Sequence, residues 1–237
     1  MITFAFGAEA WPKSLTVPDV ERHKSLLIQQ AMYARFTQPA MVLRTLSRGA
    51  LYWERWLLEK DPGRCDEERV LSGLELARDA GDWKEAELLL AHCEASSDLV
   101  GRPFLEAWSV IVRDRLQEQV DNEQRLEIAF QKFRGTKSVE DETARAELAR
   151  DVMARASEIG QVGSPVPVNA LLARIAAAQS WHEEAEGFYA ALLVCRPLWI
   201  PYIVQLSEHQ AKSDLKRAFS TIETAKSLLG ADFWLAT

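Results

Sequence analysis

Cysteine is scarce in this chain of 237 residues, which has only Cys65, Cys93 and Cys195. An odd number without paired spacing argues against the disulfide framework of a small secreted domain. Apolar runs are also short, and none reaches the roughly 18 residues that a membrane-spanning helix needs. The apolar segment Met1–Trp11 lacks the basic start of a secretory signal. These absences predict a cytoplasmic protein without a membrane span.

Positive charge is in deficit, with 28 Lys and Arg against 35 Asp and Glu and a formal net charge of −7. Contacts to a phosphate backbone require clustered Lys and Arg, so this balance disfavours nucleic acid as a partner. The alternation of apolar and polar residues that marks a half-buried strand is also lacking. The expected fold class is therefore all-α.

The common catalytic motifs are absent as well. The chain has no phosphate-binding glycine loop, no H-E-x-x-H, no C-x-x-C and no G-x-S-x-G. His182 and Glu186 are one helical turn apart and could both contact a metal ion, but the pattern supplies no third ligand. We therefore expect a protein that is not an enzyme and that holds no cofactor and no metal.

What the chain does contain is helical periodicity. Apolar residues recur three and four positions apart, which places them on one face of a helix. Longer helices are expected at about 38–60, 103–120 and 138–159, and the short links between the other segments predict antiparallel hairpins. The clearest stripes are Val70, Leu74 and Ala77; Trp83, Ala86, Leu90 and Cys93; Val168, Leu171, Leu172 and Ile175; Ala185, Phe188, Tyr189 and Leu192; and Leu215, Ala218, Phe219 and Ile222.

An internal repeat emerges when the turns between these helices are aligned. Gly81, Ser180 and Ser213 occupy equivalent turns, and their spacings of 99 and 33 are multiples of 33. A period in this range is typical of stacked helix pairs. Residues 166–197 carry the small turn residue followed by Ala185, Tyr189 and Pro197, and this segment resembles the tetratricopeptide repeat family.

The resemblance implies antiparallel helix pairs stacked as a tetratricopeptide-like α-solenoid, with irregular helices at the amino terminus. We expect an N-terminal helical segment at 1–65, a helical array at 66–160 that begins with one such pair, and C-terminal pairs at 161–237. Whether 99–160 continues the array or forms a separate bundle stays open. A helical bundle or another α-solenoid remains the alternative for the whole chain.

In that family the first helix of each pair lines a concave groove that holds an extended peptide or a partner helix. The resemblance places Arg174 in this groove, where the lone charge of its helix could pair with a partner carboxylate. The alternative is that Arg174 is an ordinary solvated residue. The predicted groove residues are Ala170, Arg174, Ala177, Ser207 and Gln210.

Charge is unevenly distributed along the chain. Residues 1–65 hold nine basic and six acidic side chains, whereas residues 66–98 hold three and ten. An acidic surface here would attract a basic partner and speed its association, or it would simply keep the protein soluble. Its predicted members are Glu68, Glu75, Asp79 and Asp82. Before it, Arg44, Arg48 and Arg55 share a helix face that we expect to point away from the core.

These features favour a protein-binding adaptor, scaffold or chaperone that holds a partner segment on the concave face of a helical array. The expected partner is a protein or peptide, with basic side chains if the acidic surface steers it. The alternative is a regulatory module that senses a small molecule or a signal peptide.

Overall fold

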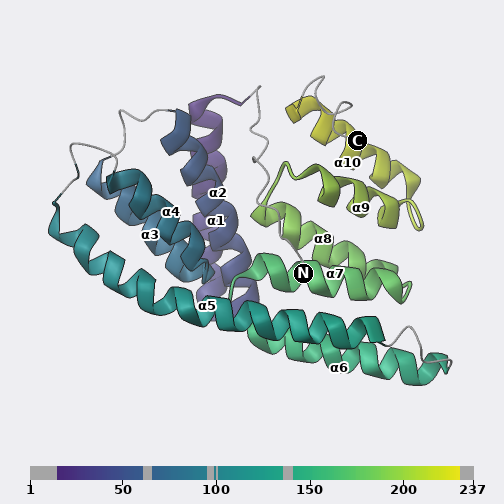
Figure 1. Cartoon of the computed structure of the whole chain (residues 1–237). Coiled ribbons are helices and arrows are strands. Elements are labelled where there is room, and N and C mark those ends of the chain that lie inside the picture. Colours follow the sequence, from purple (N-terminus) through teal and green to yellow (C-terminus); the bar gives the residue numbers. More distant parts are fainter. Residues whose placement is uncertain (1–14, 61–65, 95–98, 100, 136–140, 230–237) are drawn as a thin grey trace. The chain divides into compact units, whose positions relative to one another are not determined.

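Helices form all of the regular secondary structure in the described part of the chain. The computed structural model describes residues 15–60, 66–94, 99, 101–135 and 141–229 (Figure 1), and it contains no strand within them. The expected all-α class is confirmed. Segment Met1–Trp11 and Cys65 lie outside the described residues. The helices are α1 (Val17–Thr37), α2 (Ala40–Lys60), α3 (Glu67–Ala80), α4 (Trp83–Glu94), α5 (Pro103–Gly135), α6 (Glu142–Gly160), α7 (Pro165–Ala178), α8 (His182–Cys195), α9 (Ile200–Gln210) and α10 (Leu215–Leu229).

The helices group into two compact units. The N-terminal unit comprises Val17–Gln124 together with Gly160–Pro165. The C-terminal unit comprises Arg125–Ile159 and the described parts of Met1–Thr16 and Val166–Thr237. The division therefore falls within α5. The short Gly160–Pro165 segment, at which the sequence suggests a boundary, packs with the N-terminal unit.

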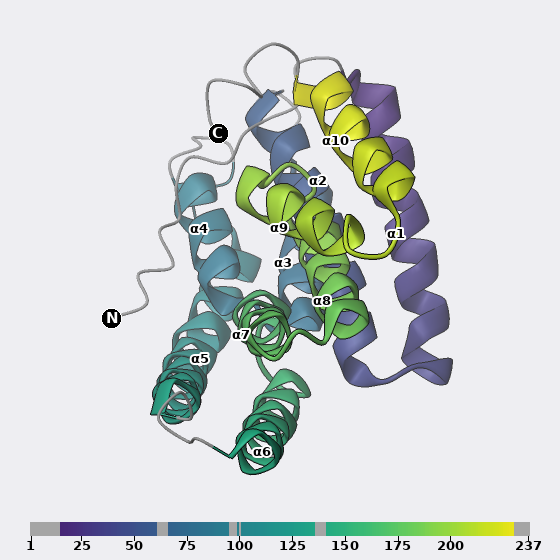
Figure 2. The same cartoon turned by 90° about the vertical axis from the view of Figure 1, so that its right-hand side faces the viewer.

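The core of the N-terminal unit lies among α1 to α4, where consecutive helices contact one another. Helices α1 and α2 run side by side in both views (Figure 2). The predicted stripes on α3 and α4 supply much of the core, although Trp83 is only partly buried. Buried members of these two stripes are Val70, Leu74, Ala77, Ala86, Leu90 and Cys93.

The C-terminal unit confirms two predicted stripes and contradicts a third. Most stripe residues of α7 and α8 are buried. On α10, in contrast, Leu215 and Phe219 are each 64% exposed. Helix α10 instead turns Ala218 and Ala225 inward, and Ala225 packs with Leu198 and Ile203. The periodicity predicts the helix correctly, but its prediction that Leu215 and Phe219 face the core is wrong.

Two helices extend beyond what the sequence patterns indicate. Helix α5 reaches Gly135, whereas the expected helix ends near residue 120. The added turns contain no proline, and their only glycine is the last residue, so nothing in them stops a helix. Helix α1 carries apolar residues on two faces, so no single apolar stripe marks it in the sequence. Val20, Ala31 and Ala34 are buried on one of these faces.

Two of the three aligned turns share the same backbone. After α3, Gly81 has φ 67°, and the N–H groups of Gly81 and Asp82 donate to the carbonyls of Arg78 and Ala77 at 3.0 and 2.9 Å. After α7, Ser180 has φ 59°, and Ser180 and Trp181 donate to the equivalent carbonyls at 3.1 and 2.9 Å. Both are Schellman motifs, which use a left-handed residue to end a helix. The turn at Ser213 does not share this positive φ.

Ser180 occupies a conformation that favours glycine, because a Cβ at positive φ approaches the following carbonyl oxygen. We predict that Ser180→Gly raises the free energy of unfolding by about 0.5 to 1 kcal/mol, after allowing for the extra freedom of glycine in the unfolded chain. Urea denaturation followed by circular dichroism measures the change. An unchanged or lowered stability would contradict the prediction.

The matched control is Gly81→Ala at the equivalent turn. There a Cβ would lie 3.1 Å from the carbonyl oxygens of Val162 and Gly163 and 2.1 Å from Arg44 Nη1, in addition to the positive φ. This variant should lose about 2 kcal/mol or more. Backbone strain alone predicts opposite signs at the two positions, so a loss at Gly81 that exceeds the gain at Ser180 would measure the added steric crowding.

Candidate functional site

The predicted groove residue Arg174 lies on the exposed side of α7 in the C-terminal unit. Its guanidinium stacks over the ring of Phe130 from α5, with 4.3 Å from Cζ to the ring centroid. Within the described residues no ion pair of Arg174 is found. A guanidinium that stacks on an aromatic ring keeps its N–H donors directed outward in the plane, where a carboxylate can bind them.

A small concavity lies beside this guanidinium. Its volume is about 20 Å³, close to the size of one water molecule or a small apolar group. The walls come from α5 and α7 and are largely apolar, with Glu127 as the acidic member. The lining residues are Leu126, Glu127, Phe130, Pro167, Ala170, Leu171 and Arg174. Two predicted groove residues, Ala170 and Arg174, therefore meet at one site.

The other predicted groove residues lie elsewhere. Ser207 and Gln210 on α9 are buried, at 6% and 4% exposure, so they do not line an open surface. Gln210 Oε1 accepts a hydrogen bond from Thr221 of α10 at 2.7 Å, and Ser207 donates to the Val204 carbonyl at 2.8 Å. The Gln210 amide thus joins α9 to α10, whereas the Ser207 hydroxyl bonds within α9. Ala177 is half-buried on α7.

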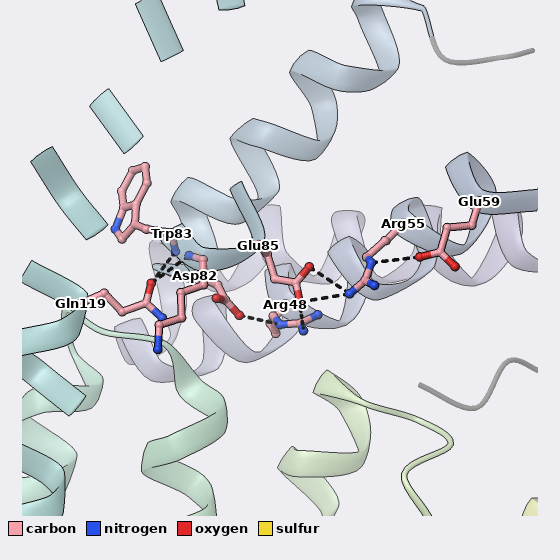
Figure 3. Close-up of polar contacts among 8 residues, drawn as sticks. Arg48, Arg55, Glu59, Asp82, Trp83, Glu85 and Gln119 are labelled. Atoms are coloured by element: carbon pink, nitrogen blue, oxygen red, sulfur yellow. Dashed lines mark hydrogen bonds and ion pairs between the residues drawn. The ribbon is translucent and has the colours of Figure 1, made fainter. Parts of the chain in front are cut away.

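The predicted basic face of α2 does not point away from the core. Arg48 is 1% exposed and donates to Asp82 at 2.8 Å and to Glu85 of α4 at 3.1 Å (Figure 3). Arg55 reaches Glu85 at 3.3 Å and Glu59 at 3.1 Å. We name Arg48, Arg55, Asp82 and Glu85 the buried ion network.

This network also corrects the predicted acidic surface. Asp82 is 6% exposed and paired with Arg48, so it cannot steer a partner. Asp79 is partly buried and pairs with Arg35 of α1 at 2.6 Å and with the neighbouring Arg78 at 3.2 Å. Of the four predicted members, only Glu68 and Glu75 are exposed. Asp79, Asp82 and Glu85 therefore neutralise arginines of the two preceding helices.

One amide side chain completes this region. Gln119 of α5 is 4% exposed, and its Oε1 accepts hydrogen bonds from the backbone N–H groups of Trp83 and Lys84 at 2.7 and 3.1 Å (Figure 3). These are two of the donors that the first turn of α4 leaves without intrahelical partners. Nothing in the local sequence identifies Gln119 as a cap, because it lies 36 residues beyond Trp83.

A histidine pair joins α8 to α9 in the C-terminal unit. The Nδ1 atoms of His182 and His209 lie 3.3 Å apart, and Tyr189 stacks on His209 at 5.6 Å between centroids. One Nδ1 must donate and the other accept, so at least one imidazole is neutral. Burial, followed by the charge of His182, lowers the pKa of His209. Glu208 and Glu186 oppose this shift, and Lys212 adds to it.

Tyr189 is also close enough to Arg174 to respond to its charge. Burial raises the pKa of the Tyr189 hydroxyl, and the charge of Arg174 acts in the opposite direction. The hydroxyl lies 3.3 Å from Gln205 Oε1 of α9. Arg174 therefore influences both the α5–α7 concavity and the buried side of α8.

Comparison with known proteins gives no relative. No family model matches the chain, and no curated protein and no solved structure is detectably similar to it. Over the residues that the structure describes, no group of three or more His, Cys, Asp and Glu side chains could hold a metal ion. None of the helices described is both long and apolar enough to cross a membrane.

The buried ion network should carry a large part of the stability of the N-terminal unit. Arg48→Met leaves Asp82 without the cation that compensates its burial, and we expect a loss of about 3 to 5 kcal/mol. Arg55→Met is the matched control, because Arg55 is 29% exposed and Glu85 keeps Arg48. This control should lose about 1 kcal/mol or less. Urea denaturation compares the two, and equal losses would contradict the assignment.

The histidine pair should make the C-terminal unit sensitive to acid. Since the pKa of His209 is lowered in the folded state, the unfolded chain binds more protons below about pH 6.5. Stability should therefore be full above that pH and fall as the pH drops through the window between the unfolded and folded pKa values. His209→Gln should flatten this slope in pH-dependent thermal unfolding. His92→Gln, on α4 of the other unit, is the control, and an equal flattening there would count against the pair.

Proposed function

We propose that this chain is a protein-binding helical module that holds a segment of a partner against the α5–α7 face of the C-terminal unit. The observation that carries the proposal is Arg174, an exposed guanidinium oriented by Phe130 at 4.3 Å beside an apolar concavity. The tetratricopeptide-like arrangement of stacked helix pairs, with its concave binding face, is part of the same proposal.

The partner segment is defined by the chemistry of this site. A stacked arginine binds a carboxylate through two parallel N–H···O bonds, and its planar group loses little freedom in doing so. The concavity has room for one small apolar group, such as the methyl side chain of alanine. Glu127, which lines the same concavity, disfavours a second acidic residue there. We therefore propose a segment in which a small apolar residue adjoins a carboxylate.

The role that fits such a site is that of an adaptor, scaffold or chaperone, which binds without carrying out a reaction. Preformed helices need no ordering when a partner binds, so a few anchors can supply most of the affinity. The exposed Glu68 and Glu75 of α3 would favour partners that also carry basic side chains, and this contribution would weaken as salt rises.

The test begins with random peptides displayed on phage and selected on the wild-type protein. Selected sequences should share a small apolar residue beside Asp or Glu. A synthetic peptide of that consensus should then bind at least about tenfold more weakly to Arg174→Glu, because the reversed charge repels its carboxylate. Fluorescence anisotropy of the labelled peptide measures both affinities.

Two variants sharpen this experiment. Arg174→Lys keeps the charge but loses the planar stack on Phe130, so its affinity should lie between wild type and Arg174→Glu. Arg134→Glu reverses an exposed charge elsewhere on α5 and should leave the affinity unchanged. Selection without a consensus, or a consensus peptide that binds wild type and Arg174→Glu equally, would contradict the proposed site.

A second candidate function rests on a different cavity. This cavity lies beside the start of α5 in the N-terminal unit. Its volume of about 340 Å³ is within the range of small-ligand pockets. Two arginines, Arg102 and Arg113, line it together with one acidic residue, Glu106, so the net positive charge of the lining favours an anionic ligand. A regulatory module of this kind should gain thermal stability from small anions such as inorganic phosphate, whereas the peptide-binding module should gain it from the selected peptide.

A further inference from the structure

Helix α1 has an apolar face that nothing in the described structure covers. Its inner face packs into the N-terminal unit through Val20, Ala31 and Ala34. On the outer face four large apolar side chains are exposed within eleven residues. Their exposed fractions are 48% for Leu26, 63% for Met32, 69% for Tyr33 and 86% for Phe36.

Such a concentration is unusual for a solvent-facing helix. Aromatic side chains present roughly 150 to 250 Å² each, so the four exposed residues together offer on the order of 400 Å² of largely apolar surface. Monomeric proteins seldom expose a contiguous apolar patch larger than a few hundred Å² without using it for binding. The outer face of α1 is therefore a candidate interaction surface.

The spacing of this face is that of a coiled-coil seam. Leu26, Gln29, Tyr33 and Phe36 follow one another at intervals of three, four and three residues, and Arg22 continues the pattern four residues earlier. Alternating steps of three and four place side chains on the narrow stripe that packs against one neighbouring helix. All five residues are exposed. The pattern thus indicates a helical partner rather than a flat surface.

We propose that the partner is a second copy of this chain, with the two α1 helices antiparallel. A two-fold axis near Ala31 sets Leu26 against Phe36 of the second copy and Gln29 against Tyr33 of the second copy. Each of these pairs then occurs twice, once on either side of the axis, as an isologous interface requires. The side chains of Gln29 and Tyr33 make no hydrogen bond within the described residues, so the Tyr33 hydroxyl is able to donate to the Gln29 amide oxygen across the interface.

The charges around the seam favour this occupant over a lipid surface. Between Leu26 and Phe36 the seam has no charged side chain, and Arg22 is the single cation that continues the stripe, one turn before Leu26. The other neighbouring arginine, Arg35, pairs with Asp79 of α3 at 2.6 Å. Binding to an anionic membrane relies on a row of Lys and Arg beside the apolar face. A neutral seam imposes no such requirement and brings no like charges together in a dimer.

The available area also sets the strength of the dimer. Stable interfaces bury about 800 Å² per partner, and the α1 seam offers about half of that. The dimer therefore belongs to the small, transient class and forms at micromolar rather than nanomolar concentrations. This association is separate from the Arg174 site, and its outcome does not depend on peptide binding.

Sedimentation velocity over a hundredfold range of protein concentration tests the proposal. The wild-type chain should shift from monomer to dimer as concentration rises. Phe36→Asp places a carboxylate in the seam and should remain monomeric throughout, with an unchanged thermal midpoint because Phe36 is 86% exposed. Ile128→Asp on α5, where Ile128 is 69% exposed, is the matched control and should dimerise like wild type.

Three results would overturn the proposal. The first is a wild-type chain that stays monomeric at every concentration. The second is dimerisation that persists in Phe36→Asp. The third is co-sedimentation of the wild-type chain, but not of Phe36→Asp, with vesicles of mixed neutral and anionic phospholipid, which would assign the face to a membrane instead.

Discussion

The constraint on which the N-terminal unit depends is the burial of charge between α2 and α4. Removing Arg48, Asp82 and Glu85 from water is costly, and the cost is offset only when the ions meet at hydrogen-bonding distance. Arg48 meets Asp82 at 2.8 Å and Glu85 at 3.1 Å, so the two helices are held in a single register. A slip by one turn would separate these partners. Apolar side chains alone tolerate such slips, since a neighbouring leucine can fill a similar space.

Ion pairs also attach α1 to this frame. Lys24 pairs with the buried Glu54 of α2, Glu21 with Arg69 of α3 at 3.0 Å, and Arg35 with Asp79 of α3 at 2.6 Å. The basic surplus of the first 65 residues and the acidic surplus of the next 33 are thus two halves of one arrangement. The uneven distribution of charge along the sequence reflects contacts between helices, whereas the sequence alone predicts an external acidic surface. Periodicity assigns residues to a face of a helix, but it carries no information on what covers that face.

The same limit explains which parts of the site could be predicted. The helix-forming stripes of α3, α4, α7 and α8 follow from spacing alone, whereas the pairing of Ala170 with Arg174 at one site is an expectation from the family resemblance. Ser207 and Gln210 were placed in a groove because the family resemblance exposes that helix, whereas Gln210 instead accepts a hydrogen bond from Thr221 of α10. Phe130, which orients Arg174, could not be found because the expected helix ended near residue 120. The shared Schellman turns at Gly81 and Ser180, 99 residues apart, were visible in the sequence as a repeat.

These internal pairings determine which groups remain for a partner. On α1, Lys24 and Arg35 pair with carboxylates of α2 and α3, and the stripe from Leu26 to Phe36 carries no charged side chain. In the C-terminal unit Arg174 contacts an aromatic ring instead of a carboxylate, and a stacked arginine retains most of its capacity to bind an anion. Replacing Phe130 by leucine would keep the apolar wall of the concavity but remove the ring that orients the guanidinium. The two proposed surfaces therefore differ in chemistry: α1 offers an apolar stripe, and α7 offers a guanidinium beside apolar side chains.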